Sequence, residues 1–279
     1  MIMKRKTKQR LVKTVSIFVL IAGAAMMLIP FIWMLSTSFK NVADVFKYPP
    51  SFLGSEFRWQ NYLEVFDTID FWGMLKNTVF VTAVVAIGQL LTSAMAGFAF
   101  SYLEFPGREI LFKMFLFAVM IPFHVMLIPT FVIMRNMKLL NTLWALILPC
   151  VISPLGAFMM RQSYMSVPRS LGEAASLDGC TPLGIWWKIY LPLSKPTLAT
   201  LAIFSFMQTW NDFIRPLIFL NSNEKMTLTL GLYNMMGNYA TNWGLMMAAV
   251  ILSILPVFIF YLCLQDFFVE GIAMAGLKG

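Results

Sequence analysis

Long apolar stretches constrain this chain most, because 59% of its 279 residues are hydrophobic and only 12% are charged. A soluble domain carries about 25% charged residues, and a helix crosses a bilayer with about 20 apolar residues. Stretches of that kind lie at about 15–34, 77–100, 110–134, 142–160, 197–220 and 244–264. The sequence therefore predicts an all-α membrane protein with six transmembrane helices in a single domain, residues 14–279.

Positive charge sets the expected orientation of these spans. Residues 1–13 form a basic segment that contains Lys4, Arg5, Lys6, Lys8, Arg10 and Lys13. Basic residues beside a span favour the cytoplasm, so we expect the N-terminus and the C-terminus to be cytoplasmic. In this orientation the inner segments hold 13 of the 21 Lys and Arg residues, and the outer segments hold 8. Because the densest cluster lies beside a span, the net charge of +8 does not indicate a nucleic-acid partner.

A cleaved signal peptide is the alternative interpretation of the first apolar stretch, because the Ala-Gly-Ala string at 22–24 resembles a cleavage site. The apolar stretch continues well beyond that string to the length of a span. We therefore expect an uncleaved first helix.

The sequence carries no pattern typical of a catalytic or metal site. The three cysteines, Cys150, Cys180 and Cys263, are odd in number, far apart and without metal-ligand spacing. Residues 271–279 superficially resemble a phosphate-binding loop, but a leucine separates the last Gly-Lys pair and no Ser or Thr follows. We expect no cofactor, no metal and no enzymatic activity.

The polar segment 163–196, between the fourth and fifth spans, predicts two short helices. Pro168 suits the first turn of one helix. Ser170 and Glu173 have the spacing of a capping box, which makes Ser170 an alternative start. The Asp-Gly pair at 178–179 predicts the end of this helix, because glycine adopts the left-handed conformation of helix ends.

The second short helix is predicted to begin at Thr181, which precedes a proline suited to the first helical position. Its apolar residues recur at helical spacing on one face. They are Leu183, Trp186, Trp187 and Tyr190. The helix is predicted to end at Leu191, because the residue before a proline is pushed out of the α region. On periodicity alone, this is an amphipathic helix at a membrane interface, where Trp is favoured.

The same segment resembles the EAA loop of ABC importer permeases. The resemblance rests on Glu-Ala-Ala at 173–175, Asp-Gly at 178–179, Ile189, Leu-Pro-Leu at 191–193 and Pro196. It implies that the two cytoplasmic helices couple the chain to an ATPase subunit, whose basic residue meets the glutamate. The residues so implicated are Glu173, Ala174, Ala175, Asp178, Gly179, Trp186, Ile189, Leu191 and Pro192.

The loop departs from the family pattern at two positions. Cys180 stands where a small Ala or Ser is usual, and Gly172 stands where a polar residue is common. Gly172 is expected to weaken the first helix by roughly 1 kcal/mol relative to alanine.

Three further blocks resemble the maltose-type branch of carbohydrate importer permeases. They are residues 121–129, residues 210–217 and the tail 267–279. The resemblance implies that the cytoplasmic tail, 265–279, reaches the ATPases. Its candidate contact residues are Gly271, Gly276 and Lys278.

Candidate residues of a translocation path are His124, Asn211 and Asp212. A lone histidine in a span is a functional hypothesis, but His124 can also satisfy the carbonyl group that Pro122 leaves free. Asp212 and Arg215 lie one helical turn apart and can form a structural ion pair instead.

The resemblance implies a multi-pass subunit of the bacterial cell membrane that forms half of an import path for a sugar or oligosaccharide. Its implied partners are the lipid bilayer, a second homologous permease, two cytoplasmic ABC ATPase subunits and an extracytoplasmic solute-binding protein. The ATPases would supply ATP hydrolysis.

One alternative is a permease for glycerol phosphate or another polar solute. A secondary transporter or a membrane scaffold without transport are alternatives from other classes. Secondary transporters often show internal repeats and acidic residues at mid-membrane. The sequence shows no clear repeat, and its few acidic residues lie near the expected membrane edges.

Overall fold

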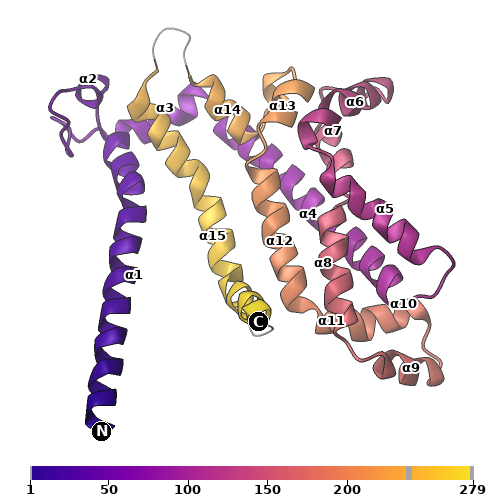
Figure 1. Cartoon of the computed structure of the whole chain (residues 1–279). Helices are drawn as coiled ribbons and strands as arrows, with labels where there is room; N and C mark the ends of the chain where they lie inside the picture. The colour runs from indigo at the N-terminus through magenta and orange to yellow at the C-terminus, as the bar shows by residue number, and fades with distance from the viewer. Residues whose placement is uncertain (1, 237–240, 277–279) are drawn as a thin grey trace. The chain divides into compact units, whose positions relative to one another are not determined.

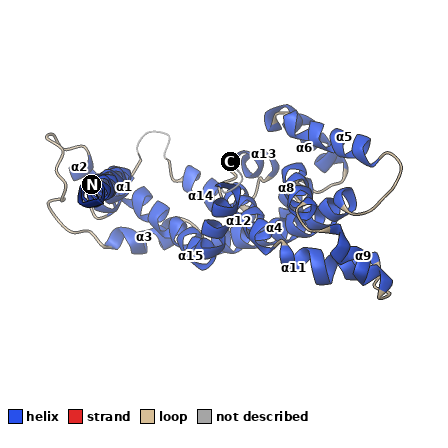
Figure 2. Cartoon of the chain, turned by 60° about the horizontal axis from the view of Figure 1, so that its bottom comes forward, coloured by secondary structure: helices blue, strands red, loops and turns tan. Residues whose placement is uncertain are grey.

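The computed structural model describes residues 2–236 and 241–276, and it describes side chains for residues 12–236, 241–263 and 265. The described residues form helices, turns and loops, and no strand occurs among them (Figures 1 and 2). The chain divides into two compact units, Met1–Ile69 with Asn234–Ile254, and Asp70–Tyr233 with Leu255–Gly279.

Between four and six membrane spans can be assigned within the described part of the chain. Four helices are long and apolar enough by themselves: Val12–Ser38, Phe71–Ser101, Leu143–Met165 and Trp243–Cys263. Two bent pairs also qualify if each pair forms one span. They are Arg108–Met120 with Phe123–Asn136, bent by 101°, and Pro182–Leu193 with Lys195–Trp210, bent by 80°. The all-α prediction is confirmed, and the predicted number of six lies at the upper limit.

In the first unit, the end of helix α1 (Ile2–Ser38) is hydrogen-bonded to the short helix α3 (Gln60–Thr68). The buried amide of Asn61 donates hydrogen bonds to the carbonyl oxygens of Ser38, at 2.8 Å, and Lys40, at 3.0 Å. The bond to Ser38 satisfies a carbonyl group that a helix end leaves unpaired. Helix α3 thus fixes the position of the end of α1.

The loop between α1 and α3 contains helix α2 (Val42–Val45) and is fixed by buried charged groups. The ammonium group of Lys40, a residue 2% exposed, donates to the carbonyl oxygen of Ser51 at 2.6 Å. The hydroxyl and backbone N–H of Ser55 both donate to Asp44 and hold the pKa of that carboxyl below its usual value. The connection is therefore an ordered substructure.

The second unit is built on helix α4 (Phe71–Ser101), which packs along α8 (Pro154–Met165) and α12 (Lys195–Trp210) (Figure 1). Small residues permit this close packing, as expected for helices in lipid. A Cβ atom added at Gly97 would lie only 2.6 Å from the Cβ atom of Met160. One added at Gly88 would lie 3.0 Å from a methyl group of Val151.

The predicted third span is present as two helices, α5 (Arg108–Met120) and α6 (Phe123–Asn136). Between them Ile121 and Pro122 have extended backbone angles. A proline disfavours the α conformation in the residue before it, which accounts for the break at Ile121. The predicted span at 110–134 is therefore interrupted, and its two helices meet at 101°.

The helix of the predicted fifth span begins near the expected residue but ends at Trp210, so the prediction of a helix to residue 220 is wrong. The side-chain amide of Asn211 donates to the carbonyl oxygen of Met207 at 2.8 Å and closes the last turn. A new helix, α13 (Ile214–Phe219), follows. This restart places Pro216 in a first helical turn, where its missing N–H is tolerated.

The remaining helices lie in the first half of the predicted fourth span and beyond α13. They are α7 (Leu143–Ile147), η1 (Leu148–Cys150), η3 (Asn223–Lys225), α14 (Leu228–Asn234) and α15 (Trp243–Gly276). Of the tail residues, Gly271 and Gly276 lie in the part of α15 whose side chains the structure does not describe, and Lys278 lies outside the described residues.

We predict that Gly97→Val destabilises the fold, because the added side chain would separate α4 from α8. Overpacking of this kind costs about 1–3 kcal/mol. The thermal unfolding midpoint of the purified protein in detergent measures the effect. Gly23→Ala in α1 is the control, because no other atom lies within 4 Å of its added Cβ. An unchanged midpoint for Gly97→Val would contradict the packing described above.

Candidate functional site

The segment between α8 and α12 folds into two short helical parts with a sharp turn between them. Helix α9 (Arg169–Leu177) is followed by Gly179, whose φ of +80° confirms the predicted left-handed conformation. The hydroxyl of Thr181 then accepts a hydrogen bond from the N–H of Gly184 at 3.2 Å, which confirms the predicted cap. The alternative start at Ser170 is wrong, because α9 already begins at Arg169.

The second part continues further than predicted, through α10 (Pro182–Ile185), the π-helical turn η2 (Trp186–Tyr190) and α11 (Leu191–Leu193). Within it the N–H of Leu191 donates to the carbonyl oxygen of Trp186, five residues earlier. A π turn is wider than an α turn, which gives room to the ring of Pro192. The chain then bends by 80° into α12.

Five aromatic residues, which we call the aromatic anchor, fix this segment to the membrane helices. They are Phe98 from α4, Tyr102 directly after α4, Tyr164 from α8, and Trp186 and Tyr190 from η2. Ring centroids lie 5.2 Å apart for Tyr190 with Phe98, 5.2 Å for Tyr190 with Tyr102, and 5.5 Å for Tyr190 with Tyr164. The indole N–H of Trp186 donates to the hydroxyl of Tyr164 at 3.3 Å. Such interlocked rings resist displacement of the segment relative to α4 and α8.

Gly172, one of the two departures from the family pattern, has a structural cause. A Cβ atom at this buried position would lie 2.6 Å from the ring of Tyr102. A glycine is therefore required for α9 to approach the aromatic anchor. The close approach offsets the low helix propensity of glycine.

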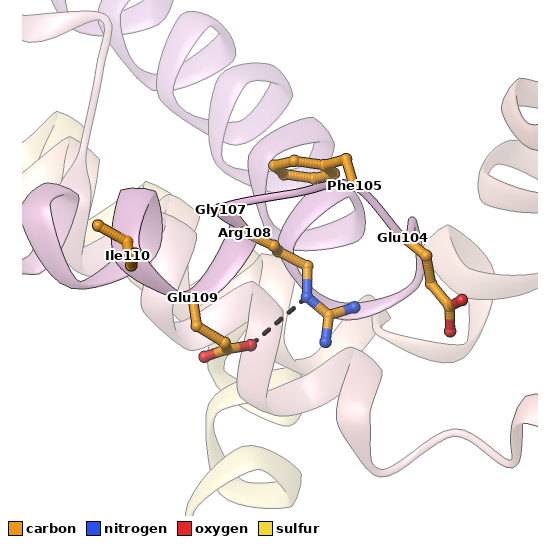
Figure 3. Close-up of a pocket in the computed structure, with 6 residues that line it drawn as sticks. All are labelled: Glu104, Phe105, Gly107, Arg108, Glu109 and Ile110. Carbon is orange, nitrogen blue, oxygen red and sulfur yellow. Dashed lines mark ion pairs between the residues drawn. The ribbon is translucent and has the colours of Figure 1, made fainter.

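The turn between α4 and α5 (Figure 3) contributes carboxylates that form further ion pairs. Glu104 lies 3.2 Å from the guanidinium group of Arg169 in α9, and Glu109 lies 2.6 Å from that of Arg161 in α8. Glu109 also pairs with its neighbour Arg108 at 3.4 Å. The turn lines a surface pocket of about 410 Å³ whose charged groups are thus paired within the chain.

The opposite side of the segment is exposed and forms what we call the tip surface. It contains Glu173, Ala174, Leu177, Leu183 and Trp187. Leu177 is 90% exposed, Leu183 64% and Trp187 59%. The single apolar face predicted for the second helix is thus divided, because Trp186 is only 5% exposed. Glu173 makes no ion pair with any residue that the structure describes.

A second candidate site lies where breaks in three helices meet. It is a cavity of about 240 Å³. Its lining comes from the residues just before the break between α5 and α6, the residues around the break between η1 and α8, the last turn of α12, and the first turn of α13. Its polar lining residues are Gln89, Ser153, Gln208, Thr209 and Arg215. Gln89, Gln208 and Thr209 were not predicted as site residues, although each is a polar residue within an apolar span.

Side chains from α4 satisfy the backbone at the break beside this cavity. The amide of Gln89 donates to the carbonyl oxygen of Cys150 at 2.7 Å, and the hydroxyl of Thr92 donates to that of Val151 at 2.8 Å. The hydroxyl of Ser153 caps α8 by accepting from the N–H of Gly156 at 3.0 Å.

Asp212 and Arg215 form the ion pair that their spacing allows. Their closest oxygen and nitrogen atoms are 2.9 Å apart, and each side chain is 16% exposed. The guanidinium group also lies 4.4 Å from the ring centroid of Phe123 in α6. None of the predicted path residues His124, Asn211 and Asp212 lines the cavity, although Asp212 contacts the lining residue Arg215. Among the residues that the structure describes, no group of three or more His, Cys, Asp and Glu could hold a metal ion.

Residues 88–273 match the protein family described as "binding-protein-dependent transport system inner membrane component". The matched region covers more than half of the chain. The chain belongs to this family. The resemblance inferred from the EAA loop is therefore confirmed, and the chain is a permease component of a binding-protein-dependent ABC transport system.

Related permeases match this one over almost its whole length. It is 34% identical to the "Arabinooligosaccharides transport system permease protein AraQ" of Halalkalibacterium halodurans, across 99% of this chain and 100% of the relative. It is 31% identical to the "sn-glycerol-3-phosphate transport system permease protein UgpE" of Salmonella typhi, across 91% and 93%.

A solved structure shares the fold of this permease. It is a chain of a bacterial ABC transporter involved in the import of the acidic polysaccharide alginate. The TM-score is 0.82 at 26% sequence identity, and the match covers 93% of this permease and 97% of the other chain.

We predict that Gly179→Val impairs transport by this permease through backbone conformation alone. The left-handed region costs an L-residue roughly 1–2 kcal/mol, and no atom beyond the two neighbouring residues lies within 4 Å of an added Cβ. Gly179→Asn is the matched variant, because asparagine tolerates this region. Transport in proteoliposomes should fall for the valine variant and be largely retained by the asparagine variant. Equal transport by both would mean that this backbone conformation is not required.

Proposed function

We propose that this permease is one of two transmembrane subunits of a bacterial importer for a sugar or oligosaccharide. In this proposal both termini are cytoplasmic, and residues 163–196 couple ATP hydrolysis in separate subunits to movement of the membrane helices. The excess of positive charge on the inner segments supports this orientation. The relative named for arabinooligosaccharide transport supports the substrate class.

The observation that carries the proposal is the contrast between the two sides of the coupling segment. One side is held by the aromatic anchor, while the tip surface exposes Leu177, Leu183 and Trp187. Exposed apolar groups of this kind mark interaction surfaces. Burial of one such side chain against a partner contributes about 1.5–3 kcal/mol. A cytoplasmic ATPase subunit is the proposed partner.

Glu173 supplies the proposed charged contact with that subunit. Its carboxylate is exposed beside the small side chain of Ala174, so a partner can approach the backbone of α9 closely. A contact between opposite charges adds specificity to an apolar interface. The aromatic anchor then transmits a displacement of the tip surface to α4 and α8.

One permease forms only part of a transport path, so we propose further partners. A second homologous permease would form the other half, two ABC ATPases would bind the two coupling segments, and a solute-binding protein would deliver substrate to the outer loops. We further propose that the tail, including Gly271, Gly276 and Lys278, contacts the ATPases.

Glycerol phosphate is the second candidate substrate, because one relative is named for its transport. The cognate binding protein distinguishes the two candidates. Thermal-shift screening of that protein against neutral oligosaccharides and sn-glycerol 3-phosphate should show stabilisation by an oligosaccharide. Stabilisation by the phosphate alone would replace the sugar in the proposal.

We predict that Glu173→Lys weakens ATPase binding without unfolding the permease, because it reverses a charge at the tip surface. The recovery of ATPase subunits in a pull-down and the substrate-stimulated ATPase rate should both fall severalfold. Glu173→Gln should have a smaller effect. Asp67→Lys, which changes an exposed carboxylate on α3, is the control. Wild-type recovery and wild-type ATPase rate for Glu173→Lys would exclude the coupling role.

A further inference from the structure

The cavity beside the three helix breaks is lined by the middle of two candidate spans. Gln89 is near the middle of α4 (Phe71–Ser101), and Ser153 is near the middle of the candidate span Leu143–Met165. Irregular backbone at membrane depth is tolerated where it is buried in protein or lines a water-filled cavity. Here the Cys150 backbone at the break is beside a polar cavity.

The chemistry of the lining is polar and electrically balanced. Arg215 is the one charged residue among those that line the cavity, and Asp212 compensates it at 2.9 Å. The other polar groups are the side-chain amides of Gln89 and Gln208 and the hydroxyls of Ser153 and Thr209. Amides and hydroxyls both donate and accept hydrogen bonds, as the hydroxyl groups of a sugar do. An anionic solute would instead favour an uncompensated cation.

We propose that this cavity is a solute-contacting wall selective for neutral polyhydroxy compounds, and that the Asp212–Arg215 pair sets this selectivity. The proposal rests on the proposed import function and extends it to a named site and substrate class. Its volume of about 240 Å³ is below the 300–1,000 Å³ typical of complete ligand pockets. It therefore fits part of a chain of sugar rings, with the rest of the path formed by the partner permease.

The Asp212–Arg215 pair determines the selectivity for neutral solutes, because either residue alone would leave an uncompensated charge in the path. Asp212→Asn leaves the guanidinium group of Arg215 uncompensated and should favour anions. Arg215→Gln leaves the carboxylate of Asp212 and should favour cations. The double variant restores neutrality and should return towards the wild-type preference, which separates charge balance from mere loss of an ion pair.

Cysteine labelling of the assembled transporter in nanodiscs tests the site directly. Gln208→Cys is made in a background in which the three native cysteines are serine. Labelling rates are then measured with neutral, anionic and cationic methanethiosulfonate reagents. Met207→Cys is the matched control, because Met207 is exposed on the same helix but does not line the cavity. Thr209→Cys replaces Gln208→Cys if the latter does not assemble.

In the first arm, neutral probes (arabinotriose and maltotriose) should protect Gln208→Cys, whereas sn-glycerol 3-phosphate and an alginate trisaccharide should not. A probe at twice its dissociation constant slows labelling about threefold by mass action. Protection by an anionic probe alone overturns the proposal. So does a lack of protection by every probe at about 100 mM, a concentration well above a millimolar dissociation constant.

In the second arm, Asp212→Asn should raise the ratio of anionic to cationic labelling about fivefold, and Arg215→Gln should lower it, because opposite charges attract in a medium of low dielectric constant. An unchanged ratio in both variants overturns the role of the pair. Because the ATPase pull-down with Glu173 variants does not involve this cavity, the coupling proposal can succeed while this inference fails, and the reverse.

Discussion

The backbone of a membrane helix must find hydrogen-bond partners within the protein, because hydrocarbon offers none. In this permease the constraint is tightest at the mid-span break between η1 and α8. Gln89 and Thr92 bond the carbonyl groups of Cys150 and Val151 there. Polar side chains are therefore required inside the membrane to hold the fold, and one of them, Gln89, lines the cavity. A polar wall within the membrane is thus a consequence of interrupting the helices.

The proposed coupling segment, residues 163–196, is also fixed to the membrane helices, but mainly by apolar contacts. Tyr190 contacts three other rings of the aromatic anchor, and Gly172 lets α9 lie directly on Tyr102. If the segment were only loosely attached, a partner could move it without displacing α4 and α8. The buried rings and the ion pairs of the α4–α5 turn give the segment the stiffness that the proposed coupling role requires.

Local sequence signals predicted local conformations well. The cap at Thr181 and the left-handed Gly179 each depend on a few neighbouring residues, and both are confirmed. What depended on contacts distant in sequence was not predicted. Gly172 looked like a weak helix position, although the glycine is explained by Tyr102, which lies at the end of α4. The apolar periodicity around Trp186 did not distinguish buried from exposed members, because that division depends on which rings of α4 and α8 are near.

The two candidate sites are connected by continuous helices, and this suggests how one acts on the other. Helix α8 runs from the break at Ser153 to the coupling segment, and α12 runs from that segment to Gln208 and Thr209 at the cavity. Near the coupling segment the two helices are joined, because the hydroxyl of Ser163 lies 3.0 Å from those of Ser194 and Thr197. At the cavity their far ends are followed by breaks instead of continuous helix. A rigid displacement of the segment would therefore move α8 and α12 together where they join it. At the cavity, the breaks allow the distance between the two helices to change.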